Sequence, residues 1–176
     1  VGAPVRVGAW FFAMSEAVPS VKLDPRQRLR SDLPLVSSSE AVVYDPSAGN
    51  HRLARILPTT GGRLAGMLVV DPRRLDVARR DLEQLIPAGS FVGAKIHPAY
   101  TTGPIDSSAM AQAVQLTSEF ELPTLIHTGG PDILDLARLA ERVPEARLIA
   151  GHMAGPSWDL IPEAAEISDR VWYEPS

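Results

Sequence analysis

Short apolar runs recur along this chain, and most are followed by a loop and then by an amphipathic stretch. The runs are continuous rather than alternating in polarity, which is typical of strands buried on both faces of a parallel sheet. Seven runs are predicted to be strands: Val5–Phe11, Leu33–Val36, Leu64–Val70, Phe91–Ile96, Thr124–Ile126, Arg147–Ala150 and Val171–Tyr173. No further run in the sequence qualifies as an eighth strand.

Four amphipathic stretches between these runs predict helices. They are Leu75–Ile86, Ser107–Phe120, Asp132–Arg142 and Ser157–Ile167. Asp45–Asn50 is instead expected to form a turn, with His51 at the start of a helix. Strands that alternate with helices of this length predict right-handed βαβ units, and therefore an α/β fold.

The length of 176 residues is enough for one domain, residues 1–176, with a sizeable core. It is shorter than the roughly 250 residues of a complete eight-stranded α/β barrel. The net charge of −4 provides no basic excess, so neither nucleic acid nor an anionic membrane surface is an expected partner.

The chain has no cysteine, which excludes disulfides, thiolate nucleophiles and cysteine-ligated zinc. The apolar start Val7–Met14 is too short to cross a bilayer, and it lacks the basic flank of a secretory signal. A cytoplasmic protein is the expectation that fits both observations.

Three of the four histidines follow successive predicted strands, directly or after one glycine: His97, His127 and His152. Ligands bind at the carboxyl ends of the strands in barrels and open α/β sheets alike, and neighbouring strand ends lie close together. A hydrogen-bonded structural role is the simpler interpretation for any single one of these histidines. For three at equivalent positions, convergence on one ligand or metal is favoured, because neutral imidazole is a common metal ligand and a general base near pH 7.

Three segments resemble motifs of the amidohydrolase-related family, which belongs to the amidohydrolase superfamily and includes metal-dependent hydrolases and aromatic-acid decarboxylases. Phe91–Pro98 resembles its fourth-strand motif, Pro123–Gly129 its fifth-strand metal-ligand motif, and Leu148–Gly155 its sixth-strand motif. The segments that resemble its second, third and seventh strands are Val36–Ser39, Leu64–Pro72 and Val171–Ser176. The resemblance implies a TIM-type (β/α) barrel, incomplete here with about seven strands.

The resemblance also implies roles for individual residues. His127 would be a metal ligand, and His152 would be the catalytic acid-base or a further metal ligand. Lys95 and His97 would line the barrel mouth and hold a substrate carboxylate.

For two residues at strand ends, Lys95 and Glu174, more than one role is compatible with the sequence. Lys95 could be carboxylated to bridge two metals, or it could be a cation that extends out of the barrel end into solvent. Glu174 could supply a carboxylate, but a solvated residue on the rim is favoured.

The sequence departs from the family at both ends. Pro4 and Arg6 stand where the family has a His-x-His pair of metal ligands, and neither side chain has a lone pair to offer a metal. Arg6 is expected to bind the substrate or ligand carboxylate at the barrel mouth, together with Lys95 and the histidines. The family's eighth-strand Asp has no counterpart before Ser176. A catalytic zinc usually takes three protein ligands, so the expected divalent metal, zinc first, has only His127 and His152 as recognisable ligands.

Two classes of function follow. The first is a metal-dependent hydrolase or decarboxylase that acts on a small organic acid, amide or lactone. The second is a catalytically degenerate relative that binds a small carboxylate or serves as a subunit of an assembly. Pro4 and Arg6 favour the second class, and the three histidines favour the first. A seven-stranded barrel has open strand edges, which predicts a homodimer or a larger assembly through them.

Overall fold

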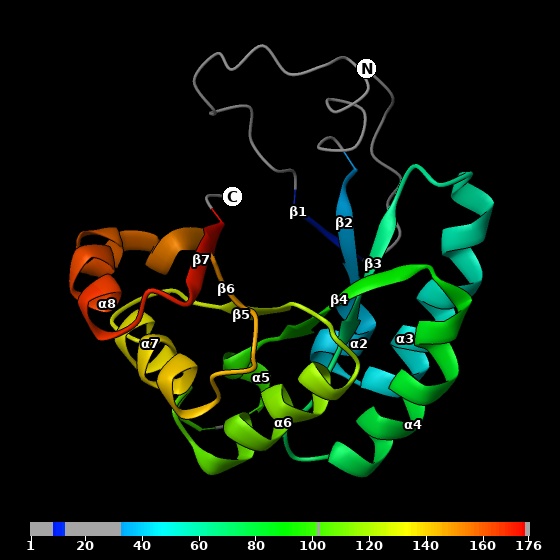
Figure 1. Ribbon diagram of the computed structural model, residues 1–176. Helices are drawn as coiled ribbons and strands as arrows, with labels where there is room; N and C mark the ends of the chain where they lie inside the picture. The colour runs from blue at the N-terminus through cyan, green and yellow to red at the C-terminus, as the bar shows by residue number, and fades with distance from the viewer. Residues whose placement is uncertain (1–8, 13–32, 102, 175–176) are drawn as a thin grey trace.

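The computed structural model describes residues 9–12, 33–101 and 103–174. Its strands and helices alternate along the chain as far as β7 (Figure 1). The strands are β1 Ala9–Phe12, β2 Leu35–Ser38, β3 Ala65–Val69, β4 Phe91–Ile96, β5 Thr124–His127, β6 Leu148–Gly151 and β7 Val171–Glu174. The α-helices are α2 Ser39–Val43, α3 Pro46–Ile56, α4 Leu75–Leu85, α5 Pro98–Thr101, α6 Ser108–Glu119, α7 Ile133–Arg142 and α8 Ile161–Ile167. Three 3-10 segments complete the list: η1 Leu57–Thr60, η2 Ile86–Ala88 and η3 His152–Leu160.

All seven described strands form one sheet whose spatial order is the order of the sequence. Strands β2 to β7 are parallel, and Figure 1 shows the long helices α3, α4, α6 and α7 along one side of the sheet. A doubly wound sheet reverses its strand order and has helices on both faces, whereas a barrel does neither. Within the described residues the sheet ends at β1 and β7 without closing. The predicted incomplete α/β barrel is therefore confirmed.

Six of the seven predicted strands lie within two residues of the observed ones at each end. The first, Val5–Phe11, lies only partly within the described residues, which contain β1 at Ala9–Phe12. The expected parallel arrangement is wrong for β1, which pairs with β2 antiparallel. An apolar run carries no signal for the direction of its neighbour, so its sequence could not show this.

The prediction of a turn at Asp45–Asn50 is wrong, because helix α3 begins there. The side chain of Asp45 accepts a hydrogen bond from the backbone N–H of Ala48 at 3.1 Å, and Pro46 occupies the first turn. Both are signals of a helix N-terminus. His51 consequently lies inside α3 rather than at its start.

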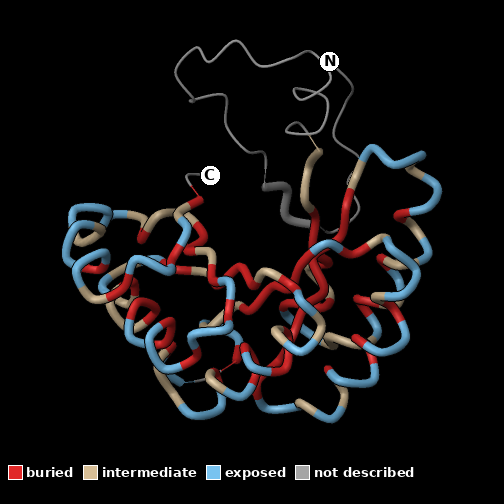
Figure 2. The backbone as a smooth tube through the Cα atoms, in the orientation of Figure 1, coloured by how far each residue is buried: buried red, intermediate tan, exposed pale blue. Residues whose placement is uncertain are grey.

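Successive side chains along each strand point to opposite faces of the sheet. On the face toward the helices, Leu68, Ala94 and Ile126 pack in the main core with residues such as Leu82 of α4 and Leu136 of α7. Figure 2 shows this burial along the strands and the exposed outer surfaces of the helices. The opposite face of the sheet carries Ser37, Lys95, His127 and Glu174 among its polar residues.

A buried polar network joins α3 and α4 to β3. Asn50 is fully buried, and its side-chain amide both accepts from the N–H of Val69 and donates to the carbonyl of Val69, each at 2.9 Å. The same amide donates to buried Asp81 at 3.2 Å, and Asp81 also accepts from Ser47 Oγ at 2.8 Å. Asn50 thereby replaces a strand partner for β3 at a place where its pairing with β2 has ended.

None of the helices in the described part of the chain is long and apolar enough to cross a bilayer.

Candidate active site

The structure brings His97, His127 and His152 together at the ends of β4, β5 and β6. The rings of His97 and His127 are stacked, with centroids 4.0 Å apart and planes at 16°. The ring of His152 meets His127 edge to face, with centroids 4.7 Å apart and planes at 71°. The fourth histidine, His51, lies outside this cluster, with Nε2 3.3 Å from a carboxylate oxygen of Asp81.

The ring planes decide which histidines could share a metal ion. An imidazole nitrogen donates through a lone pair in its ring plane, so a bound ion lies close to that plane. The nearly parallel planes of His97 and His127 do not meet near the rings, and this pair cannot ligate one ion in the arrangement seen. The planes of His127 and His152 cross, so ring orientation does not exclude an ion shared by these two imidazoles.

The donors of the described residues do not by themselves complete a metal site. No group of three or more His, Cys, Asp or Glu side chains within residues 9–12, 33–101 and 103–174 is arranged to hold a metal ion. Two imidazoles fall short of the three protein ligands that a catalytic zinc usually has. Pro4 and Arg6 lie outside the described residues, so the first-strand position and the predicted role of Arg6 have no structural account.

Lys95 lies inside the barrel beneath this cluster, with only 2% of its surface exposed. The alternative in which Lys95 extends into solvent is therefore wrong. Burial lowers the pKa of Lys95 to about 7, although the charge of Glu174 acts in the opposite direction. Glu174 is itself buried with 8% exposed, so the favoured interpretation of a solvated rim residue is also wrong.

The two stacked imidazoles are held in the neutral form. Burial, followed by the charge of Lys95, lowers the pKa of His97 to about 4. Burial, followed by the charge of His97, lowers the pKa of His127 to about 4. Their lone pairs are consequently available near pH 7. Nδ1 of His97 is buried and has no hydrogen-bond partner among the described residues.

The sequence did not single out two further residues of this region. Ser37 on β2 is 1% exposed, and its hydroxyl has no hydrogen-bond partner in the described part of the chain. Tyr100 meets the ring of His97 edge to face, at a centroid distance of 4.8 Å. Ser37 could have been found from its place at the polar end of a predicted strand, whereas nothing in the sequence marks Tyr100.

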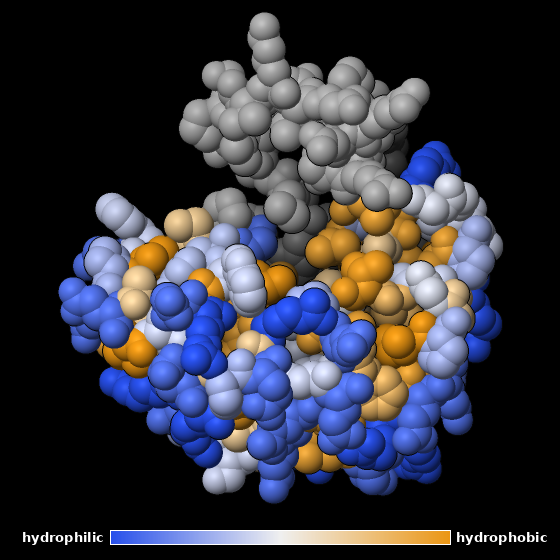
Figure 3. Space-filling view, in the orientation of Figure 1, coloured by the Kyte–Doolittle hydropathy of each residue, from blue (hydrophilic) through white to orange (hydrophobic). Residues whose placement is uncertain are grey.

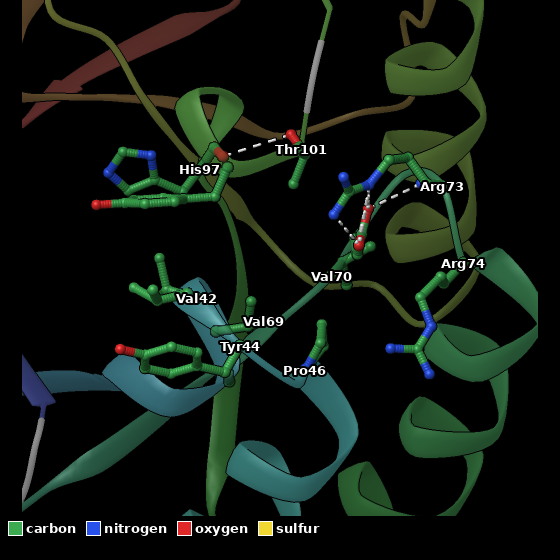
Figure 4. Close-up of a pocket in the computed structure, with 13 residues that line it drawn as sticks. Val42, Tyr44, Pro46, Val69, Val70, Arg73, Arg74, His97 and Thr101 are labelled. Carbon is green, nitrogen blue, oxygen red and sulfur yellow. Dashed lines mark hydrogen bonds and ion pairs between the residues drawn. The ribbon is translucent and has the colours of Figure 1, made fainter.

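A cleft borders the cluster on the side of His97. Its lining residues come from the segments that follow β2, β3 and β4, so it opens at the carboxyl ends of these strands. Figure 4 shows His97 and Tyr44 along one side of the cleft and Arg73 and Arg74 along the other. Its volume of about 90 Å³ is smaller than the roughly 300–1,000 Å³ of typical small-molecule sites. In Figure 3, apolar residues gather over β2, β3 and α2, whereas the surface over α6 and α7 is mostly hydrophilic.

Asp71, at the wall of this cleft, fixes the loop that follows β3. Its buried carboxylate accepts from the backbone N–H of Arg73 at 2.9 Å and from the Arg73 guanidinium at 2.8 and 2.9 Å. Burial alone would raise the pKa of Asp71, but the hydrogen bonds and charge of Arg73 outweigh it and lower the pKa below its ordinary value.

The pH dependence of stability follows from this direction. A carboxyl whose folded pKa is lowered stabilises the fold above its unfolded pKa, about 3.9, and loses this contribution as the pH falls through the folded pKa. We expect Asp71→Asn to lower the free energy of unfolding by about 1 kcal/mol at pH 7, because Arg73 is half exposed and screened by solvent. Urea unfolding between pH 2 and pH 7 should show this difference shrink at the acidic end.

Asp76→Asn is the matched control, because Asp76 is 80% exposed and pairs with Arg80 on the surface of α4. This variant should unfold close to the wild-type midpoint throughout. A constant deficit of Asp71→Asn down to pH 2 would contradict a role for the ionised carboxylate.

Comparisons with known proteins place these observations in a family. A sequence profile described as amidohydrolase matches residues 9–176. No curated protein matches. The structure is similar to 5-carboxyvanillate decarboxylase from Novosphingobium aromaticivorans, solved with manganese, at 15% identity and a TM-score of 0.59. That alignment covers 82% of this chain and 53% of the decarboxylase.

A second similar structure is 2,6-dihydroxybenzoate decarboxylase from Rhizobium, at 16% identity and a TM-score of 0.57. That alignment covers 82% of this chain and 59% of the enzyme. At these identities the likeness shows a shared fold. The chain spans about half the length of the solved structures that it resembles.

Proposed function

Because this chain belongs to the amidohydrolase family, whose profile covers residues 9–176, we propose that it forms part of a metal-dependent enzyme that decarboxylates or hydrolyses a small organic acid. The observation that carries the proposal is the convergence of three imidazoles at successive strand ends beside a buried lysine. Buried titratable groups gathered at the carboxyl ends of barrel strands are where this fold places its chemistry.

The crossing ring planes support His127 and His152 as the residues that would hold a divalent ion. Both similar decarboxylases act on aromatic acids, and one was solved with manganese, so Mn²⁺ is the ion to test first. Zinc, favoured by the sequence, stays a prediction. A divalent ion here would polarise a carboxylate, a carbonyl or a water molecule, and its remaining ligands would come from outside the described residues.

The other groups would bind and orient the substrate. Lys95 is a buried lysine of the inner face, and its protonated form would give a substrate carboxylate that reached it a charge-assisted hydrogen bond. His97 would donate to or accept from the same acid, since its ring lies between the cluster and the cleft. His152 would carry the proton that replaces CO₂ on the substrate carbon, or the proton taken from water in a hydrolysis, if His127 alone ligates the ion.

A second function is favoured by one specific observation. The described residues offer no third metal donor, which is the arrangement expected of a relative that binds a small carboxylate without turning it over. In that case Lys95 and the histidines would hold the ligand as above, and no metal would be needed for binding.

The test uses purified protein, stripped with a chelator and reloaded with MnCl₂, with 2,6-dihydroxybenzoate and 5-carboxyvanillate as probes. We expect about one Mn²⁺ per chain by elemental analysis, and loss of the probe's ultraviolet absorbance with time. Saturable probe binding without metal and without turnover would support the binding protein instead, and absence of both metal and probe binding would contradict both functions.

Lys95→Met is expected to weaken binding of 2,6-dihydroxybenzoate by about ten- to a hundredfold, because one hydrogen bond to a charged group is lost in a buried site. Mn²⁺ content should stay at the wild-type level, because Lys95 is not a proposed ligand. Arg63→Met is the control, since Arg63 lies just before β3 at the other end of the strands. Equal probe affinity of Lys95→Met and wild type would contradict the role given to Lys95.

A further inference from the structure

The chain makes an unusual turn directly after β6, at the histidine cluster. His152, Met153 and Ala154 all have positive φ, at 65°, 46° and 62°, and Gly155 follows at 53°. A side chain in the left-handed region crowds its own backbone, so three such residues in succession persist only where the surrounding structure fixes them. The backbone that carries His152 therefore depends on whatever holds this turn.

The hydroxyl of Thr128 is the group that holds both ends of the turn. Thr128 Oγ1 donates to the carbonyl of Gly151 at 2.6 Å and accepts from the backbone N–H of Ala154 at 3.1 Å. The backbone N–H of Thr128 also donates to the carbonyl of Gly151, at 3.2 Å. Thr128 and Ala154 are both fully buried, so water cannot replace these bonds.

The sequence position of Thr128 makes this connection specific. Thr128 is the residue after His127, and its two partners, Gly151 and Ala154, lie on either side of His152 and Met153. The Thr128 side chain therefore connects the backbone next to His127 with the backbone on both sides of His152.

We propose that Thr128 is a positioning residue that sets His152 at its edge-to-face orientation against His127. The proposal deepens the function given above, and only its metal-binding consequence rests on that function. Thr128 is not itself a proposed contact of the metal or of the substrate. It acts through the turn, as outer partners of metal ligands do elsewhere.

The test compares two substitutions that differ in one respect. Thr128→Val keeps the branched shape and removes the hydroxyl, whereas Thr128→Ser keeps the hydroxyl and removes a methyl group. Three quantities are measured on the ¹⁵N-labelled protein: amide hydrogen exchange of Ala154, ring resonances of His152 and His127, and affinity for Mn²⁺. Thermal unfolding of each variant shows that it is folded.

In Thr128→Val we expect Ala154 to exchange about tenfold faster or more, because its N–H loses its partner. The His152 ring resonances should move further than those of His127, and Mn²⁺ affinity should fall about ten- to a hundredfold. Thr128→Ser should stay close to wild type in all three measurements.

The proposal is overturned if Thr128→Val leaves Ala154 exchange and the His152 resonances unchanged, or if folded Thr128→Ser is as disruptive as Thr128→Val. If Thr128→Val does not fold, the Thr128→Ser result decides, with wild-type exchange at Ala154 supporting the proposal. Absence of Mn²⁺ binding by the wild type would contradict the proposed metal site alone, since exchange and ring resonances still test Thr128.

Discussion

Replacing His127 by alanine is expected to lower the affinity of this protein for Mn²⁺ by about a hundredfold or more, a larger loss than removal of an outer partner causes. His127 is the middle ring of the cluster, stacked on His97 and met edge to face by His152. Its neutral lone pair lies in a plane that crosses the plane of His152, and no third donor group among the described residues could compensate for its loss. The measurement is calorimetric titration of the stripped protein with MnCl₂.

His51→Ala is the matched control, because it removes the one histidine outside the cluster. This variant should bind Mn²⁺ as the wild type does, since His51 contacts Asp81 on the helix side of the sheet. Wild-type affinity in His127→Ala, or an equal loss in both variants, would show that the metal binds elsewhere.

Asn50→Leu is expected to lower the free energy of unfolding by about 3 kcal/mol or more, because it leaves several buried polar groups without partners. The side chain is fully buried, and it satisfies both the N–H and the carbonyl of Val69 while donating to Asp81. Leucine fills a similar volume but offers neither a donor nor an acceptor. Chemical denaturation followed by circular dichroism measures the difference.

Gln84→Leu provides the comparison, because it makes the equivalent chemical change at an exposed position of α4. Its free energy of unfolding should stay within about 0.5 kcal/mol of wild type. If Asn50→Leu were as stable as Gln84→Leu, the network between α3, α4 and β3 would contribute nothing to stability.

The positions of the strands could be predicted from the sequence because strands buried on both faces give continuous apolar runs. Phe91–Ile96 was predicted to the residue, and the strands that end near His127 and His152 differ from the observed ones by one residue. Since neighbouring parallel strands end side by side, the meeting of His97, His127 and His152 followed from their positions alone. The family resemblance named the same three residues independently.

Other features depend on contacts between distant segments, which no local pattern encodes. Lys95 and Glu174 are buried because they lie on the inner face of a curved sheet. From the sequence alone, a charged residue at a strand end is equally compatible with a position in solvent. The antiparallel direction of β1 is likewise set by its neighbour rather than by its own residues. Asn50 looked like part of a turn because its partner, Val69, lies 19 residues away.

The role proposed for Thr128 could not be predicted from the sequence for the same reason. Its hydroxyl bonds residues 23 and 26 positions further along the chain, and the left-handed turn that it holds contains no sequence of turn-forming residues before Gly155. In the sequence, a threonine after a strand-end histidine resembles an ordinary loop residue. Its bonds are evident only once the ends of β5 and β6 are placed side by side.

The proposed function depends on a divalent ion held by His127 and His152. The most direct measurement is a crystal structure of the Mn²⁺-loaded protein with data collected at the manganese absorption edge. We expect an anomalous peak in contact with a ring nitrogen of His127, near the line where the ring planes of His127 and His152 cross and outside the plane of His97. A loaded crystal with no peak at His127, or with the ion bound away from the three histidines, would contradict it.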